Sequence, residues 1–360
     1  MLAFDSAPPP PHEEITKHPH NGNESYLSLV WRRLRRSWTG MMGLILVGLL
    51  LFMAIFADFF APMDPKATDV GFAPPQLVSL RDQRGVEVVL HARDDGSTDA
   101  TREILARHAD RWPALADLPS GPNLGAAHSF LELLRTAPDG ADYYAFCDQD
   151  DVWLPGKLQR AVNFIAADEG PALYCSNVTC VDEQLQVLGV PAANGDTRFQ
   201  HLLFENIAYG CTSVMNRAAR ALITTPPPPG RLTMHDWWSV LVVAAVGGRI
   251  HYDPEPAILY RQHGANAVGG EATAAARMWK QFMLIARSPR GGYAIHAQAA
   301  ELIRLYGEDM PDAARRAADR LVASKRSTLA RLTYALGREV TRTRAVDALA
   351  ARGLVALGWY

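Results

Sequence analysis

The stretch Tyr-Tyr-Ala-Phe-Cys-Asp-Gln-Asp-Asp-Val-Trp-Leu-Pro-Gly-Lys-Leu, residues 143–158, decides how this chain folds. Its first five residues form a short apolar run typical of a buried strand, and the run stops at three carboxylates, Asp148, Asp150 and Asp151. Pro155 then stands where the first turn of a helix begins. The acids therefore lie in a strand-to-helix loop, which is where open α/β sheets bind ligands.

The acidic loop has two interpretations that its own residues leave open. Asp148 and Asp150 are separated by one residue and can share a divalent cation, because magnesium-type ions take one or two carboxylates together with substrate phosphates. The alternative is an acidic turn that caps the following helix.

Composition places the chain among ordinary globular proteins and excludes some partners. Its 360 residues suffice for one large or two medium domains, with 48% hydrophobic and 21% charged residues. A net charge of -2 argues against nucleic-acid binding, which needs a basic surface. The cysteines have no CxxC or zinc-type spacing, which predicts reduced core residues in a cytosol-facing domain: Cys147, Cys175, Cys180 and Cys211.

The amino-terminal part predicts a membrane anchor. Residues 1–24 are polar, proline-rich and aperiodic, which predicts a disordered tail. An arginine cluster within residues 32–36 precedes the uncharged run 37–57, and a run of about 20 residues is long enough for a transmembrane helix. A signal peptide is the competing interpretation, but the run is too long and lacks a clear cleavage pattern. We expect a single-pass, membrane-associated protein.

From Val86 onward the chain alternates strands and helices. The predicted strands 86–90, 143–147 and 172–181 are separated by helices, a pattern typical of a mostly parallel, doubly wound sheet. Residues 271–360 are predicted to be helical, and the part after Pro311 is rich in arginine. That basic part suits a membrane surface or an ordinary solvated helix face, and the sequence leaves both open.

Carboxylates recur where strands end or helices begin. Asp94 and Asp95 follow the first predicted strand, Asp148 and Asp150 the second, and Asp236 opens a later helix. The carboxyl ends of strands in such a sheet meet at one edge, so these side chains are expected near each other. A nucleoside-diphosphate donor needs recognition of its base, neutralisation of its diphosphate and a general base for the acceptor, and the three turns supply those groups.

A set of motifs between residues 76 and 268 resembles family 2 glycosyltransferases, closest to the rhamnosyltransferase-like group. The motifs occur in the family's order: Ala92-Arg-Asp-Asp-Gly-Ser-Thr-Asp99, Asn123-Leu-Gly125, Cys147 to Leu158, Asn206 with Gly210-Cys-Thr212, His235-Asp-Trp-Trp238 and Tyr260-Arg-Gln-His-Gly264. The resemblance implies a Rossmann-like GT-A fold and Mg²⁺ or Mn²⁺ as cofactor. It also implies transfer with inversion from a dTDP- or UDP-linked sugar, rhamnose among the candidates, to a saccharide or lipid-linked acceptor.

The same resemblance assigns roles to individual residues. Asp236 would be the catalytic base, Asp150 and His263 would bind the metal, and Asp148 would bind the donor ribose or sugar. Asp95 would accept from the pyrimidine N–H while Asp94 holds the turn. The other expected donor contacts are Asn123, Gly210, Cys211, Thr212, His235, Trp237 and Arg261. Helix capping by His235 and Asp236, and core packing of Trp237, are the alternatives.

Residues 25–75 resemble the amino terminus of dipeptide or oligopeptide ABC-transporter permeases, and this segment stands where the family's first strand belongs. We therefore expect an amino-terminally truncated GT-A domain over residues 76–270, followed by a helical region over 271–360. Either residues 44–59 replace the missing strand or the domain is impaired. The alternative is a non-enzymatic permease fragment fused to an inactive sugar-nucleotide-binding remnant. The arginine cluster also predicts the amino terminus inside, although the catalytic domain is expected to work in the cytoplasm.

Overall fold

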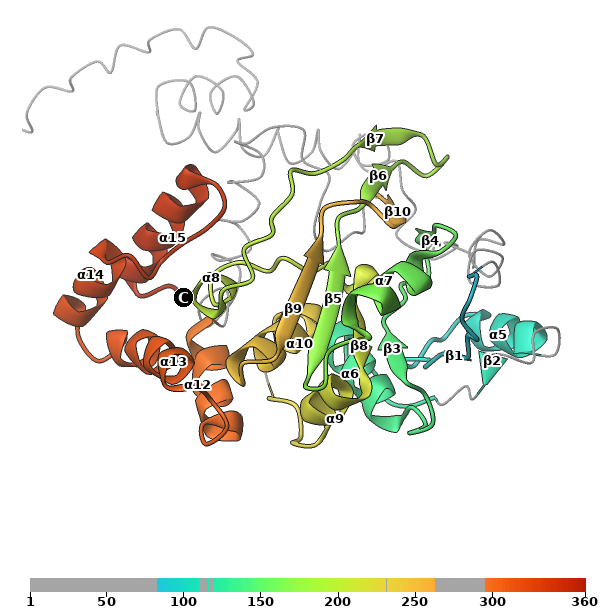
Figure 1. The fold of residues 1–360 in the computed structure, drawn as a ribbon, viewed down its shortest axis with the longest axis horizontal. Helices are drawn as coiled ribbons and strands as arrows, with labels where there is room; N and C mark the ends of the chain where they lie inside the picture. The colour runs from blue at the N-terminus through green and yellow to red at the C-terminus, as the bar shows by residue number, and fades with distance from the viewer. Residues whose placement is uncertain (1–82, 110–114, 117–119, 231, 263–294) are drawn as a thin grey trace, which may run out of the picture. The chain divides into compact units, whose positions relative to one another are not determined.

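The computed structural model describes residues 83–109, 115–116, 120–230, 232–262 and 295–360, all within one compact unit, residues 71–360 (Figure 1). The predicted disordered tail, the predicted transmembrane helix at 37–57 and His263 lie outside these residues. Within the described ranges no helix combines the length and apolar character that a bilayer crossing requires.

The central sheet has four strands in the order β3-β8-β5-β9 (Figure 1). Their bounds are β3 Tyr143–Ala145, β8 Val214–Asn216, β5 Ala172–Ser176 and β9 Arg249–Asp253. Strand β8 runs antiparallel to both β3 and β5, whereas β5 and β9 are parallel. Every residue of β5 is buried, as expected for an apolar strand with neighbours on both sides.

The described residues form two further sheets. One has four strands in the order β4-β10-β6-β7, and the other consists of β1 and β2, which are parallel. Their bounds are β4 Val152–Trp153, β10 Ile258–Arg261, β6 Thr179–Val181, β7 Val187–Gly189, β1 Leu90–His91 and β2 Leu115–Ala116. In the sheet β4-β10-β6-β7, only the pair β10 and β6 is parallel.

The α/β class is confirmed, but the prediction of a mostly parallel sheet was wrong. Four of the seven strand pairings in the described residues are antiparallel. The reason lies in the connections. A helical crossover returns the chain in the same direction, but the long path between β5 and β8 contains hairpin β6–β7 and irregular loops, so β8 enters reversed.

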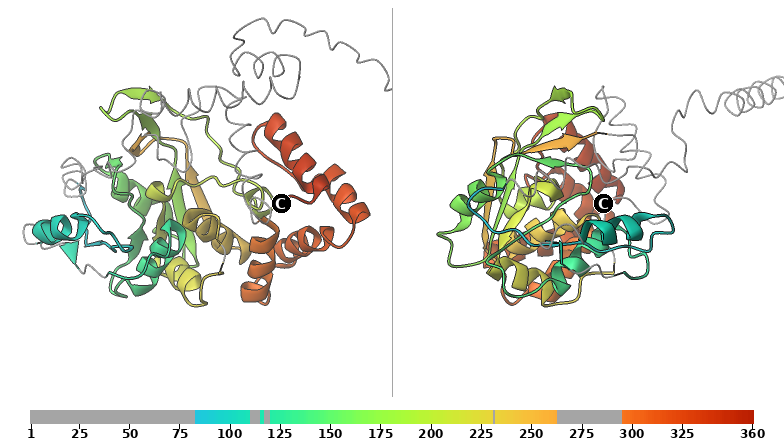
Figure 2. Two further views of the ribbon diagram at one scale, coloured as in Figure 1. Left: turned by 180° about the vertical axis from the view of Figure 1, so that it is seen from behind. Right: turned by 90° about the vertical axis from the view of Figure 1, so that its right-hand side faces the viewer.

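Helices cover both faces of the central sheet (Figures 1 and 2). On β5, Ala172 and Tyr174 share one cluster with α7 (Lys157–Ile165), while Leu173 and Cys175 belong to the main core on the other face. That core includes α6 (Ala126–Thr136), α9 (Arg217–Thr224) and α10 (His235–Ala245). Ten of the eleven residues of α10 are buried, and its second half, residues 240–245, is an unbroken apolar run.

The expected carboxy-terminal helices are present from residue 295 onward. They are α12 (Ile295–Tyr306), α13 (Asp312–Ser324), α14 (Thr328–Leu336) and α15 (Ala345–Leu357). They extend the main core: the Trp238 and Tyr306 rings lie 6.5 Å apart, and the Tyr306 hydroxyl donates to the Leu222 carbonyl at 3.2 Å. The helical region therefore packs directly against α10.

The predicted loss of the family's first strand can be compared with the pairing of β1 and β3. Among the described residues β1 pairs only with β2, and β3 pairs only with β8. A strand between β1 and β3 would join the two sheets. The loss stays a prediction, and residues 44–59 fall outside the described part.

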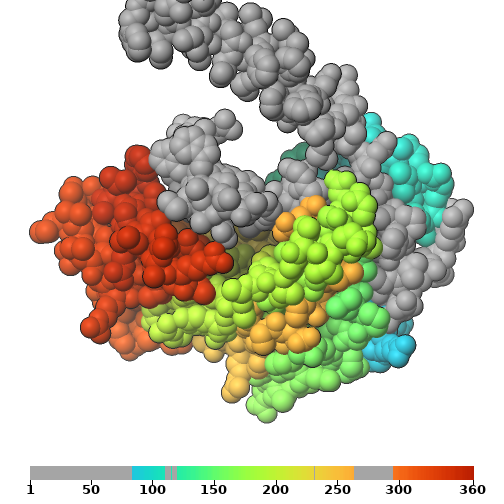
Figure 3. Space-filling model, turned by 90° about the horizontal axis from the view of Figure 1, so that it is seen from above, coloured from blue at the N-terminus to red at the C-terminus, as the bar shows by residue number. Residues whose placement is uncertain are grey.

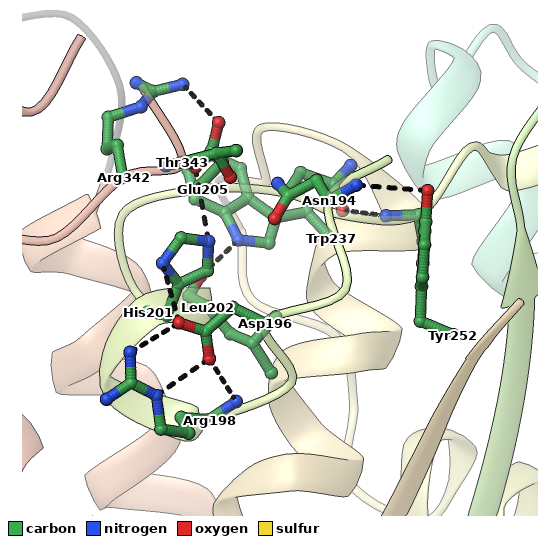
Figure 4. Close-up of polar contacts among 12 residues, drawn as sticks. Asn194, Asp196, Arg198, His201, Leu202, Glu205, Trp237, Tyr252, Arg342 and Thr343 are labelled. Atoms are coloured by element: carbon green, nitrogen blue, oxygen red, sulfur yellow. Dashed lines mark hydrogen bonds and ion pairs between the residues drawn. The ribbon is translucent and has the colours of Figure 1, made fainter. Parts of the chain in front are cut away.

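A buried charged cluster joins the short helix α8 (Phe199–Leu202) to the carboxy-terminal region (Figure 4). His201 is 2% exposed and lies between two carboxylates, with Nδ1 3.5 Å from Asp196 and Nε2 3.2 Å from Glu205. Glu205 also accepts the backbone N–H of Thr343 at 2.6 Å and lies 3.7 Å from the Arg342 guanidinium. Burial opposes ionisation of Glu205, but His201, Thr343 and Arg342 together lower its pKa to about 2.

Replacing Glu205 with glutamine is therefore expected to destabilise the protein by about 2 kcal/mol at pH 7. Because the folded-state pKa is lowered from 4.5 to about 2, the contribution is present above pH 4.5 and is lost as the pH falls toward 2. Urea unfolding at pH 7 and at low pH measures it. Asp312→Asn, which removes an exposed ion pair with Arg316, is the control and should change little. An equal loss of stability at both pH values for Glu205→Gln would contradict this account.

Candidate active site

The first acidic turn follows β1 and is organised by its own carboxylates. Asp94 is buried and its Oδ1 accepts the backbone N–H of Ser97 at 3.0 Å, which closes the turn. Asp95 accepts the N–H groups of Leu124 and Gly125 at 2.9 Å each, together with the Arg93 guanidinium. Burial alone would raise the pKa of Asp95, but these hydrogen bonds and the nearby guanidinium lower it below its ordinary value.

Asp95 therefore connects the first turn to the loop before α6. In that loop Asn123 accepts the N–H of Gly125 through its own Oδ1 at 3.0 Å. Arg93 reaches the same loop, donating to the Ser129 hydroxyl at 2.7 Å and the Pro122 carbonyl at 3.0 Å. The two predicted donor-binding loops thus form one hydrogen-bonded unit.

The second acidic turn brings Asp148 and Asp151 together with Cys211 of the 3₁₀ helix η1 (Gly210–Thr212). One ligand atom from each of the three lies within 4.8 Å of the others. Burial, followed by repulsion from Asp151 and Asp150, raises the pKa of Asp148 to about 7. Burial likewise raises the pKa of Asp151 to about 6 and that of the Cys211 thiol well above its ordinary value.

Asp151 and Arg261 fix the acidic turn against β10. Asp151 is fully buried and its Oδ1 accepts the backbone N–H of Arg261 at 3.0 Å. The Arg261 side chain donates to the Asp150 carbonyl at 3.0 Å and to the Glu183 carbonyl at 3.1 Å. Arg261, which we predicted as a donor contact, therefore holds the backbone of the turn, while Asp150 itself is half-buried.

A buried cation lies beneath the same turn. Lys157 is 1% exposed, and its Nζ lies 3.5 Å from the centroid of the Trp153 ring. Burial lowers the pKa of Lys157 to about 8, although Cys147, Cys211 and Asp151 act in the opposite direction. The ammonium group therefore offsets part of the negative charge that the turn concentrates.

The third turn is the start of α10, where Asp236 is 2% exposed. Its Oδ1 accepts the backbone N–H of Trp237 at 2.6 Å, and Asn206 and the Gly210 backbone also donate to the carboxylate. Burial raises the pKa of Asp236 to about 6 despite these hydrogen bonds. The charge of Asp236 raises the pKa of Asp148 as well, so the second and third turns share one electrostatic environment.

His235 precedes Asp236 and packs between aromatic rings. Its ring is stacked on Phe130 at 4.1 Å and meets Phe146 edge-on at 4.6 Å. Burial lowers the pKa of His235 to about 3, so the imidazole is neutral at physiological pH. His235 thus acts as a wall of the site and carries no charge there.

Two of the predicted donor contacts have internal partners. Trp237 is 3% exposed and its indole N–H donates to the Leu202 carbonyl at 2.7 Å, which agrees with the core-packing alternative (Figure 4). Thr212 is fully buried, donates to the Tyr209 carbonyl at 2.8 Å and accepts the N–H of Ser176 at 3.2 Å. Both side chains shape the site from inside the core.

Gly210 is required by the close approach of His235. A Cβ atom at this position would lie 2.7 Å from Nε2 of His235 and 3.6 Å from Cβ of Asp236. We expect Gly210→Ala to destabilise the fold by about 1–3 kcal/mol and to displace the start of α10. Thermal unfolding measures this effect. Gly140→Ala, where a Cβ would meet open space, is the matched control, and equal melting temperatures for the two variants would contradict this packing.

Several residues of the site were not singled out from the sequence. Arg93 lies within the first motif, and its position beside two acids is the only signal that could have identified it. Lys157 looked like an ordinary residue of the first helical turn, and Asp151 was not distinguished from its neighbours. Their burial depends on β10 and η1, which lie more than 50 residues away in the sequence.

Comparison with known proteins agrees with these motifs. Residues 75–216 match the family described as glycosyl transferase family 2, and residues 25–75 match the N-terminal TM domain of oligopeptide transport permease C. Both resemblances inferred from the sequence are therefore confirmed. The chain contains a glycosyltransferase domain of family 2.

Among curated proteins, a dTDP-rhamnosyl transferase, RfbG of Shigella flexneri, is 28% identical over 202 residues, which cover 54% of this chain and 69% of that protein. An uncharacterized protein of Mycobacterium tuberculosis is 27% identical over 213 residues, 57% of this chain and 58% of that protein. This chain therefore spans little more than half the length of the mycobacterial relative.

Two solved structures show weaker likeness. TarS of S. aureus, residues 1–349 in complex with UDP-GlcNAc, has a TM-score of 0.46 and 14% identity, covering 78% of this chain and 76% of that one. The mannosyltransferase PcManGT of Pyrobaculum calidifontis, in complex with GDP-Man and Mn²⁺, has a TM-score of 0.43 and 19% identity, covering 81% and 83%. At these scores the GT-A assignment stays a prediction.

Proposed function

We propose that the chain transfers a sugar, with inversion, from a nucleoside-diphosphate donor to a hydroxyl of a saccharide or lipid-linked acceptor. The observation that supports this most directly is the buried Asp236 carboxylate at the start of α10, coupled electrostatically to the acidic turn of Asp148. The dTDP-rhamnosyl transferase from Shigella makes dTDP-rhamnose the first donor to test, with UDP-linked sugars second.

Asp236 would take the proton of the acceptor hydroxyl as its oxygen attacks the anomeric carbon. A general base works best when its pKa lies near the working pH, and burial brings the pKa of Asp236 to about 6. Asn206, Gly210 and Trp237 hold the carboxylate in place through hydrogen bonds. The aromatic wall of His235, Phe130 and Phe146 would exclude water beside it.

The acidic turn fits a divalent cation of the magnesium type. Asp148 and Asp150 supply carboxylate oxygens, which hard cations prefer, whereas the raised pKa of Cys211 keeps that thiol protonated and unsuited to Mg²⁺. Asp151 is buried and accepts the N–H of Arg261, so we assign Asp151 to anchoring the turn, Asp150 to the cation and Asp148 to the donor ribose or sugar. When bound, Mg²⁺ or Mn²⁺ would neutralise the diphosphate leaving group.

The loop of Asp94, Asp95 and Asn123 would hold the donor base. Because Asp95 already accepts two backbone N–H groups and a guanidinium, it would position the loop as much as contact the pyrimidine. His263, the proposed second metal ligand, follows Gln262 in the sequence, directly after the end of β10 at Arg261. Membrane attachment through residues 37–57 remains part of the proposal, and the family match at 25–75 supports it.

Calorimetric titration of dTDP and UDP into the full chain, with and without Mn²⁺, tests donor binding. We expect binding that requires the cation and that is lost on addition of EDTA. Glu255→Gln, which removes an exposed acid outside the three turns, is the control and should bind as wild type does. Cation-dependent binding without turnover of any sugar nucleotide would favour the inactive remnant, and absence of binding would overturn the proposal.

A further inference from the structure

The last two helices of the chain expose apolar side chains in a regular pattern. The exposed fractions are 75% and 83% for Leu329 and Leu336 on α14, and 71% and 63% for Leu349 and Leu357 on α15. Leu332 lies on the same side of α14 at 43%, and Val346 on the same side of α15 at 63%. Spacings of three, four and eight residues place each set on one side of its helix. Single exposed leucines are common, but two such faces on adjacent helices indicate an interaction surface.

The opposite sides of the same helices are already packed. Tyr334 and Ala335 of α14 and Ala351 and Val355 of α15 belong to the main core. The two helices also pack against each other, and they lie together at the carboxy-terminal, red end of the described chain (Figures 1 and 3). The exposed leucines therefore form second faces that the core of this unit does not use. We call helices α14 and α15 with these faces the α14–α15 hairpin.

The hairpin is also strongly basic. Residues 325–360 contain seven arginines and lysines and two acids, in a chain whose net charge is -2. One of the acids, Glu339, is paired with Arg320 of α13. Among the basic residues, Arg326, Arg338 and Arg344 are exposed and form no ion pair with any described residue. Their charges are available to an outside partner.

We propose that the α14–α15 hairpin lies on an anionic lipid surface, with its leucine faces in the headgroup region and its arginines on the lipid phosphates. A helix with an apolar side and a basic polar side binds in the plane of such a surface. Trp359, 45% exposed at the end of α15, suits the same interface. A second copy of this chain is a poorer occupant, because two faces with the same excess of positive charge would repel each other.

The test places an environment-sensitive dye on Leu336→Cys in the full chain and adds vesicles of about three parts phosphatidylcholine to one part phosphatidylglycerol. We expect a blue shift with these vesicles, little response to phosphatidylcholine alone, and reversal at high salt. The dye on Ala106→Cys, an exposed position on α5 (Thr101–Ala109), should not respond. Wild-type protein treated with the dye corrects for labelling of the native cysteines.

A double variant distinguishes membrane binding by the hairpin from membrane binding by the predicted anchor at 37–57, which would also attach the chain to vesicles. Leu329→Gln with Leu349→Gln should weaken the response at residue 336 by about tenfold or more. The matched pair Thr328→Gln with Thr333→Gln, exposed polar positions on α14, should not. No shift at 336 with anionic vesicles would overturn the proposal. A shift that appears without lipid and follows protein concentration would also overturn it, since a second copy would then be the occupant.

Discussion

Asp236→Asn is expected to lower the turnover number for sugar transfer by about a thousandfold. Asparagine can still accept the N–H groups of Trp237 and Gly210, but it cannot take the acceptor proton. Donor binding should stay close to that of wild type, because Asp236 acts on the acceptor side. Steady-state transfer kinetics and calorimetric donor titration separate the two effects.

The pH dependence of kcat/KM for the wild type is a second test of Asp236 as the catalytic base. Because burial raises the pKa of Asp236 to about 6, kcat/KM should fall as the pH drops through 6 and the base becomes protonated. A raised pKa also means that the ionised carboxylate costs folding free energy near pH 7. Asp236→Asn should therefore be at least as stable as wild type there. A large loss of stability at pH 7 would show that Asp236 is a structural helix cap.

Asp150→Asn is expected to lower transfer by about a hundredfold and to raise the Mn²⁺ concentration that activity requires. The neighbouring variant Asp151→Ala is the matched comparison, because Asp151 is fully buried and accepts the backbone N–H of Arg261. For Asp150→Asn we expect a raised Mn²⁺ requirement with a nearly unchanged melting temperature. For Asp151→Ala, which removes the acceptor of the Arg261 N–H from the core, we expect mainly a lower melting temperature. The reverse pattern would exchange the roles assigned to these two acids.

The sequence predicted the elements that carry the motifs. The apolar run after Asp142 forms β3, and His235 opens α10 with Asp236 in its first turn. The helix expected to start at Pro155 is present but begins at Lys157, with Gly156 as its cap, so Pro155 lies just before it. These features depend on local hydrophobic patterns and on turn residues, so they can be read from neighbouring positions. The helical character of the carboxy-terminal region was predicted in the same way.

Other features depend on contacts between distant segments, and no local pattern reveals them. The reversed direction of β8 follows from the path of the chain after β5. Asp151 contacts Arg261, 110 residues later. The pKa of Glu205 is lowered first by the nearby His201 and then by Thr343 and Arg342, which lie far away in the sequence. The amphipathic faces of α14 and α15 could be drawn from the sequence, but which side is exposed required the structure.

The most direct test of the proposed activity is hydrolysis or transfer of sugar nucleotides by the purified full chain in the presence of Mn²⁺. A panel of dTDP- and UDP-linked sugars, dTDP-rhamnose first, is compared for wild type, Asp236→Asn and Asp150→Asn. We predict release of a nucleoside diphosphate by wild type that is lost on addition of EDTA and nearly absent in both variants. Equal release by all three proteins, or none from any donor, would contradict the proposal that these three acidic turns form a glycosyl-transfer site.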